Sequence, residues 1–347
     1  MKRLLLLLIC VLGAVPAAAQ QVRLITIGPG DAFWSAYGHT AIAIDDEVYG
    51  FGYFSFDLET IKAFINNQMM YELGLSSSNH EHHLARSQNR DFSVITLDLE
   101  PAQVAAISHY LQWHYRPENQ TYRYDYFLQN CATKIRDLLI LAWPNRWEQD
   151  SQQTTESSYF DLTFPARHQG LMNLGLAMGY GPAAYAPRTD WELMAFPVHL
   201  ERHLLQMGLP QVGERDLLFD AHHAQGLRYY WLTHWALLSW LLLWTLLLSR
   251  PWVAAAKAWF WVHGLIGVVL LAGWWLTPHQ VMAWNANILL FTPLGWFTAW
   301  WPRLKLAVGL GWLLWLLISV WLGAWYLLPL LLPAGLAWRR LSVPHQT

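Results

Sequence analysis

One of the two cysteines in this chain of 347 residues stands where a helix is expected to begin. Residues 124–140 read YDYFLQNCATKIRDLLI, in which Asn130 is a favoured N-cap residue and Cys131 would be the first helical residue. A thiol there lies beside unpaired backbone N–H groups and the positive end of the helix dipole, both of which lower its pKa. Lys134 and Arg136 add positive charge nearby. The segment predicts a cysteine nucleophile, with Asn130 capping the helix at an oxyanion site; the alternative is a buried structural cysteine.

A cysteine nucleophile needs a general base, which is usually a histidine from elsewhere in the fold. The best candidate is His39 in SAYGHTAIAI, because it follows Gly38 at the start of an apolar strand that would hold the imidazole rigidly. A purely structural histidine is the alternative at this position.

Two histidine clusters, at residues 79–90 and 220–226, invite a search for a metal. Neither NHEHHLARSQNR nor DAHHAQG has the histidine pair at i and i+4, with a glutamate between them, that marks a zinc metalloprotease. We therefore expect no catalytic metal and no other cofactor.

The beginning of the chain predicts export. Residues 1–19 combine Lys2 and Arg3 with a short apolar run and three alanines, the layout of a secretory signal peptide. Cys10 would leave with this peptide, so Cys131 would be the one thiol of the mature chain, without a partner for an internal disulfide.

The C-terminal third predicts a membrane domain, residues 229–340. Most of the 23 tryptophans gather there, and apolar runs at 229–249, 252–276, 281–301 and 304–333 each approach the length of a membrane crossing. Two prolines interrupt the last run, which could hide a fifth crossing. The near-neutral net charge of −2 gives no basic surface for nucleic acid.

Basic residues in the loops orient this domain. Arg250 and Lys257 follow the first run, and Arg303 and Lys305 follow the third, so both loops should be cytoplasmic. Residues 20–228 would then lie outside, as a periplasmic domain at the bacterial inner membrane. The pair Arg339–Arg340 would be cytoplasmic only with five crossings, and the sequence leaves four or five helices open.

The exported part alternates between strand and helix patterns. Residues 21–28, 40–45, 47–54 and 93–99 have the composition of strands, whereas 101–116 begins with proline and carries apolar residues at helical spacing. This predicts a mixed α+β domain.

The order of the two motifs is informative. GHTAIAI…VYGFGYFSFD followed by YDYFLQNCATKIRDLL resembles the periplasmic domain of the Lnb-type lipoprotein N-acyltransferases, and the resemblance continues at residues 187–200 and 277–294. It implies a circularly permuted papain-like (cysteine-peptidase-like) fold with Cys131 as nucleophile and His39 as base. Relatives usually have an Asn-Tyr-Gly-x-Phe-Asp-type run where this chain has Gly50-Phe51-Gly52-Tyr53-Phe54-Ser55, so no third residue is assigned to orient the imidazole.

The resemblance implies a two-step acyl exchange. Cys131 would take an acyl chain from a phospholipid as a thioester, and the N-terminal amine of a diacylglyceryl lipoprotein would then receive it. Between the second and third apolar runs, His279, Trp284, Asn285 and Asn287 form what we call the polar island. Of these, His279, Asn285 and Asn287 could bind lipid head groups, or the island could hydrogen-bond neighbouring helices.

Two other functions are compatible with these residues. The same constellation could hydrolyse peptides or amides as a membrane-tethered papain-like cysteine hydrolase, although a soluble substrate would not require several membrane crossings. The domain could also be an inactive scaffold, against which the presence of both Cys131 and His39 argues.

Overall fold

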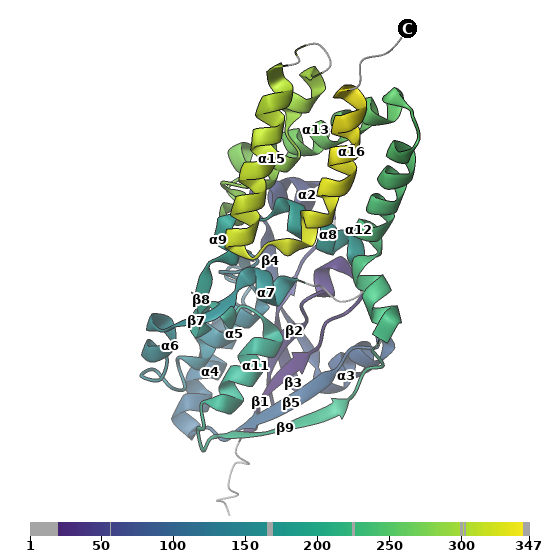
Figure 1. Cartoon of the computed structure of the whole chain (residues 1–347). Helices are drawn as coiled ribbons and strands as arrows, with labels where there is room; N and C mark the ends of the chain where they lie inside the picture. The colour runs from purple at the N-terminus through teal and green to yellow at the C-terminus, as the bar shows by residue number, and fades with distance from the viewer. Residues whose placement is uncertain are drawn as a thin grey trace, which may run out of the picture.

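The computed structural model of the chain describes residues 20–342, apart from residues 56, 165–168, 224–225, 299–300 and 302. The proposed signal peptide, residues 1–19, lies outside the described residues. Figure 1 shows two parts: a sheet with helices around it, and a bundle of helices stacked on one end of it.

The first part is built on a seven-stranded sheet in which each pairing is antiparallel. The order across the sheet is β6-β4-β3-β2-β1-β5-β9. The strands are β1 (Val22–Ile27), β2 (His39–Ile44), β3 (Glu47–Tyr53), β4 (Met70–Ser77), β5 (Phe92–Leu97), β6 (Thr121–Arg123) and β9 (Val212–Phe219). The predicted strands are all present, and a hairpin with Asp45 at a positive φ joins β2 to β3.

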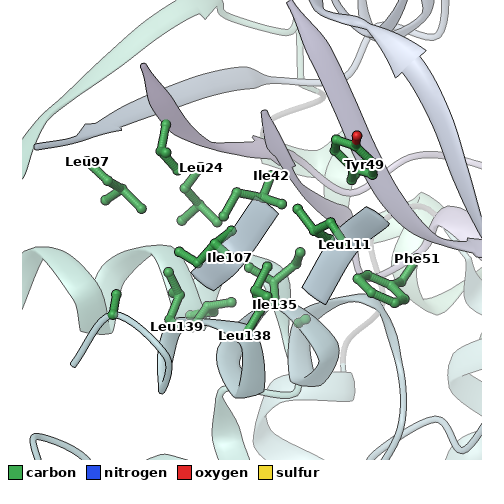
Figure 2. Close-up of a cluster of buried hydrophobic side chains, with 14 of the residues drawn as sticks. Leu24, Ile42, Tyr49, Phe51, Leu97, Ile107, Leu111, Ile135, Leu138 and Leu139 are labelled. Atoms are coloured by element: carbon green, nitrogen blue, oxygen red, sulfur yellow. The ribbon is translucent and has the colours of Figure 1, made fainter. Parts of the chain in front are cut away.

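One face of this sheet carries the main core. Three helices pack there: α4 (Pro101–His114), α5 (Cys131–Leu139) and α11 (Pro197–Gln206). Figure 2 shows Leu24 and Ile42 from the strands meeting Ile107 of α4 and Ile135 of α5. These side chains are fully buried, and burial of this apolar area fixes α5 against the strand that begins with His39.

Smaller elements cover the rest of the sheet. The helix α3 (Ser78–Ser87) packs behind the sheet, where Ala85 joins a second cluster with alternate residues of β1, β2 and β5. The helix α2 (Leu58–Ile65) connects β3 to β4, and a two-stranded sheet pairs β7 (Thr154–Ser158) with β8 (Pro187–Thr189). The mixed α+β prediction is confirmed.

The second part contains three helices long and apolar enough to cross a membrane, counted over the described residues. They are α12 (Gly226–Ser249), α13 (Val253–Leu276) and α15 (Arg303–Leu322). They share an apolar core with α8 (Gly170–Gly179), a short helix from the preceding domain whose Asn173 donates to the Thr233 carbonyl at 3.0 Å.

The segment expected as a third continuous crossing, residues 281–301, is broken. It contains η2 (Gln280–Met282), α14 (Asn287–Leu290) and η3 (Pro293–Phe297). The break is packed against α13: a Cβ on Gly267 would come within 1.9 Å of the Phe291 carbonyl oxygen. Irregular backbone is tolerated at membrane depth where protein covers it, as here.

The described part of the chain ends at the far end of the bundle, away from the sheet (Figure 1). After α15 it turns back through η4 (Trp325–Leu330) and α16 (Leu331–Ser342). Arg340 donates to the Ser249 carbonyl at 3.0 Å, and Lys305 donates to the Leu341 carbonyl at 2.6 Å. The end of α12, the start of α15 and the end of α16 therefore lie together.

Candidate thiol site

The α5 helix begins at Cys131 because Asn130 caps it. The Asn130 Oδ1 accepts from the Thr133 N–H at 2.9 Å, and the Thr133 hydroxyl accepts from the Asn130 N–H at 2.8 Å, which completes a capping box. The thiol of Cys131 is half-buried and stands at the first turn of the helix.

The remaining hydrogen-bonding capacity of Asn130 is used to position the turn. Its amide donates to the Tyr126 carbonyl at 2.9 Å and to the Ala195 carbonyl at 2.8 Å. Both amide hydrogens are therefore committed, and the side chain is buried. Any oxyanion would be received by backbone N–H groups rather than by the Asn130 side chain, whose oxyanion role stays a prediction.

The thiol lies against the backbone of β2. The N–H groups of Thr40, Ala132 and Cys131 itself reach the sulfur by hydrogen bonds. Since Thr40 directly follows His39, the strand beside the sulfur is the one that begins with His39. These N–H groups form the cradle that could hold a negative charge at this position.

The pKa of Cys131 differs from the sequence expectation. Burial raises the pKa of the thiol above its usual value, and the N–H groups of Thr40, Ala132 and Cys131 offset part of that rise. The helix terminus therefore acts in the predicted direction but is outweighed by desolvation. The resting residue is a neutral thiol that needs a base.

His39 is held as a neutral imidazole. Burial, followed by the nearby charge of Arg90, lowers the pKa of His39 to about 4. The ring packs against the backbone of two glycines. A Cβ on Gly50 would lie 3.3 Å from the ring Nε2, and a Cβ on Gly52 would lie 3.7 Å from Cε1. Among the described residues, no carboxylate or amide hydrogen-bonds the ring, so packing rather than a third polar residue orients it.

Arg90 is a site residue that the sequence reading missed. Its side chain is buried, and Nε donates to the Gly28 carbonyl at 2.8 Å, which ties it to the loop leading to Gly38 and His39. Its positive charge lowers the pKa of both Cys131 and His39. It stands just before β5, far from either motif, so no local pattern indicates its role.

The cations that the sequence offered are engaged elsewhere. The Lys134 ammonium lies 4.8 Å from the centre of the Tyr122 ring, and the Arg136 guanidinium lies 3.7 Å from that of Trp191. Arg136 also pairs with Asp137 at 2.7 Å. Arg90 is thus the cation whose field reaches the thiol.

Tyrosines form a wall beside Cys131. Tyr71 stacks on Tyr124 with ring centres 4.0 Å apart and lies 6.4 Å from Tyr122. Burial raises the pKa of all three phenols, and a thiolate at Cys131 would raise each further. They therefore stay neutral and give the thiol an aromatic surround.

The polar island is satisfied by protein groups. Asn285 donates to the Met178 and Gly179 carbonyls, at 2.8 and 2.9 Å. Asn287 donates to the Ala177 carbonyl at 2.9 Å, and its oxygen accepts from Trp315 Nε1 at 2.9 Å. These bonds fasten α8 and α15 to the broken segment. The predicted substrate-binding role of Asn285 and Asn287 stays a prediction.

His279 connects the island to the thiol site. Its Nδ1 lies 3.0 Å from the Tyr126 hydroxyl, in the turn before Asn130, and its Nε2 lies 2.9 Å from the Phe64 carbonyl of α2. The membrane bundle and the Cys131 turn are therefore joined by one histidine, whose substrate-binding role is likewise untested.

The two histidine clusters lie on a helix and in a loop, where we assign them no catalytic role. Residues 78–87 form α3, and His223 pairs with Asp91 at 3.2 Å. Over the described part of the chain, no group of three or more His, Cys, Asp or Glu side chains could hold a metal ion.

An α+β domain in which a helix beginning with cysteine packs on a strand beginning with histidine, joined to three membrane-length helices, supports a multi-pass membrane protein with a thiol site. Residues 14–161 match the family model of the Lnb N-terminal periplasmic domain, a range that includes His39, Arg90 and Cys131. This match, together with the C-terminal helices, supports an Lnb-type protein. No curated protein and no solved structure matches it.

Proposed function

We propose that this protein is a membrane-anchored thiol acyltransferase that moves an acyl chain from a phospholipid to the N-terminal amine of a diacylglyceryl lipoprotein. The observation that carries the proposal is the placement of Cys131. Its thiol lies among backbone N–H groups beside the strand that begins with His39, in a domain hydrogen-bonded to a membrane bundle through His279. The match of residues 14–161 to the Lnb N-terminal periplasmic domain supports the same proposal.

The first step would form a thioester. The Cys131 sulfur attacks the ester carbonyl of a phospholipid while His39 accepts the thiol proton. The carbonyl oxygen carries the negative charge of the tetrahedral intermediate, and the N–H groups of Cys131 and Ala132 stabilise it. The carbon–oxygen bond then breaks, His39 returns its proton to the glycerol oxygen, and a lysophospholipid leaves.

The second step would release the thiol. The lipoprotein amine attacks the thioester carbonyl, His39 takes a proton from the amine, and the carbon–sulfur bond breaks. The proton passes to the sulfur, which leaves an amide on the acceptor and the free thiol on the enzyme. A neutral imidazole is the form that both steps require, and burial keeps His39 in that form at neutral pH.

The arrangement of the chain supports two finer parts of the proposal. The histidine strand β2 precedes the cysteine helix α5, as a permuted papain-like fold requires. The basic residues Lys305 and Arg340 lie at the end of the bundle away from the sheet, which by the positive-inside rule supports a periplasmic thiol domain and a bundle in the inner membrane.

The direct test is the mass of the enzyme itself. Full-length protein in nanodiscs containing a phospholipid with isotope-labelled acyl chains should gain one labelled acyl group on the peptide that contains Cys131. Addition of a diacylglyceryl peptide should remove that group and return it as an amide on the peptide. Failure to detect acyl-Cys131 under conditions where peptide bonds are cut would favour a hydrolase instead. Complementation of a strain lacking its lipoprotein N-acyltransferase, followed by mass spectrometry of lipoprotein N-terminal peptides, tests the acceptor.

A further inference from the structure

The α2 helix carries an apolar stripe that the described protein covers only in part. Its residues read LETIKAFI, and none of them is buried. Leu58 is 77 % exposed, Ile61 44 % and Ile65 48 %. At positions i, i+3 and i+7 these three side chains form one stripe along the helix.

An exposed apolar stripe on a short helix is stabilised by contact with another apolar surface. A helix of eight residues is marginal in water, and helices in proteins are stabilised mainly by packing of their apolar face. The side chain of Asp57 caps the start of α2 by accepting from Thr60 N–H at 2.8 Å, but this satisfies only backbone groups. The face itself still requires an apolar environment.

The position of α2 indicates what that environment is. The Phe64 carbonyl near its end accepts from His279, three residues beyond the end of α13. That end of α13 exposes Trp275 by 75 % and Leu276 by 76 %, as expected of lipid-facing side chains near a membrane surface. In Figure 1, α2 stands beyond the sheet, at the level of the helical bundle.

We propose that α2 is an interfacial helix whose Leu58, Ile61 and Ile65 lie among the acyl chains of the leaflet on the side of the thiol domain. Lys62 flanks this stripe and can reach the phosphate level, as basic side chains beside such faces do. The occupant of the apolar face is the same bilayer that the bundle crosses, so no second protein is needed to cover it.

This placement puts lipid beside the segment that carries the thiol. Asn67, just after α2, donates to Asp125 at 3.0 Å and accepts from Arg123 at 2.9 Å. His279 contacts both the end of α2 and Tyr126. The helix is therefore a lipid-covered wall next to the turn before Asn130, and under the proposed function it would border the entry of the donor lipid.

The test uses the fact that Cys131 is the one cysteine among the described residues. In the full-length Cys131→Ser protein in nanodiscs, a fluorophore is attached to Ile61→Cys, and its quenching by lipids with a nitroxide on the acyl chain is measured. Glu59→Cys samples another side of α2, and Leu205→Cys samples an exposed apolar residue of α11, away from the bundle.

We expect the label at position 61 to be quenched at least twofold more than the label at 59 and far more than the label at 205. Equal quenching at 61 and 205 would overturn the proposal. Because the serine variant makes no thioester, the result is independent of whether acyl transfer occurs. Each variant is first checked for the melting temperature of its parent, so that a misfolded helix is not counted.

Discussion

The thiol site and the polar island both place polar side chains in apolar surroundings, and their hydrogen bonds are arranged in opposite ways. In the island, Asn285 and Asn287 give their amide hydrogens to the carbonyls at the end of α8. At the thiol site, Cys131 is approached by backbone N–H groups, and the ring of His39 rests on glycine backbone.

This difference separates stability from reactivity. A buried amide whose partners are all protein groups resists exchange, because losing one partner leaves a buried group unsatisfied. A thiol and a neutral imidazole without committed side-chain partners remain available to exchange a proton with a substrate. The comparison predicts that changes at the thiol site remove activity from a stable protein, whereas changes at the island lower stability first.

The largest effect is expected for Cys131→Ser. A serine hydroxyl stays protonated at neutral pH and is a far poorer nucleophile, so acyl transfer should fall below detection. Labelled acyl on the peptide, measured by mass spectrometry, reports the loss, while membrane abundance and melting temperature should match the wild type. Near-normal transfer by the serine variant would exclude the thioester route.

His39→Ala should lower turnover about 10²- to 10⁴-fold, the usual contribution of a general base. The exposed His80 of α3 offers a matched control, since His80→Ala should leave turnover unchanged. If His39→Ala lost abundance in proportion to activity, its role would be structural.

The same variant tests the low pKa of His39. Between pH 6.5 and about 4 the unfolded chain binds a proton on this histidine that the folded chain does not. Stability that is present at neutral pH is therefore lost as the pH falls through this window. The melting temperature of His39→Ala should fall less steeply over that range than that of the wild type.

Arg90→Gln should reduce thiol reactivity by a smaller factor, about three- to tenfold at pH 8. Removal of the guanidinium raises the pKa of Cys131 further, since its charge lowers that pKa in the wild type. The pH profile of alkylation by iodoacetamide should move to higher pH, and Arg90→Lys should restore most of it. An unchanged profile would assign Arg90 to holding the Gly28 loop alone.

Asn287→Leu should have the smallest effect on chemistry. The Ala177 carbonyl and Trp315 would lose their partner, at a cost of about 1–2 kcal/mol in the free energy of unfolding. Melting in detergent measures this loss, and turnover per folded molecule should stay within about twofold. A marked rise in KM for phospholipid at normal stability would instead support a substrate-binding island.

The sequence by itself determined the features that depend on neighbouring residues. An asparagine before Cys131 caps a helix because its side chain reaches N–H groups only three residues away. Apolar runs long enough to cross a membrane predict α12, α13 and α15, because hydropathy also depends only on neighbouring residues. The strands on either side of Asp45 follow from alternation and turn chemistry, and the order of motifs gave the resemblance to the Lnb-type proteins that the family match supports.

The tertiary structure decided everything that depends on residues distant in the chain. Packing of α5 on the sheet that contains β2 and β5 brings Thr40 to the Cys131 sulfur and Arg90 within range of its charge. The same packing buries the thiol, which raises its pKa. Hydropathy could not show that residues 281–301 are broken, because a broken and a continuous helix bury the same apolar side chains. The contact of Phe291 with Gly267 shows how the broken segment packs on α13. The hydrogen bond from Arg340 to Ser249 shows where the end of α16 lies in the bundle.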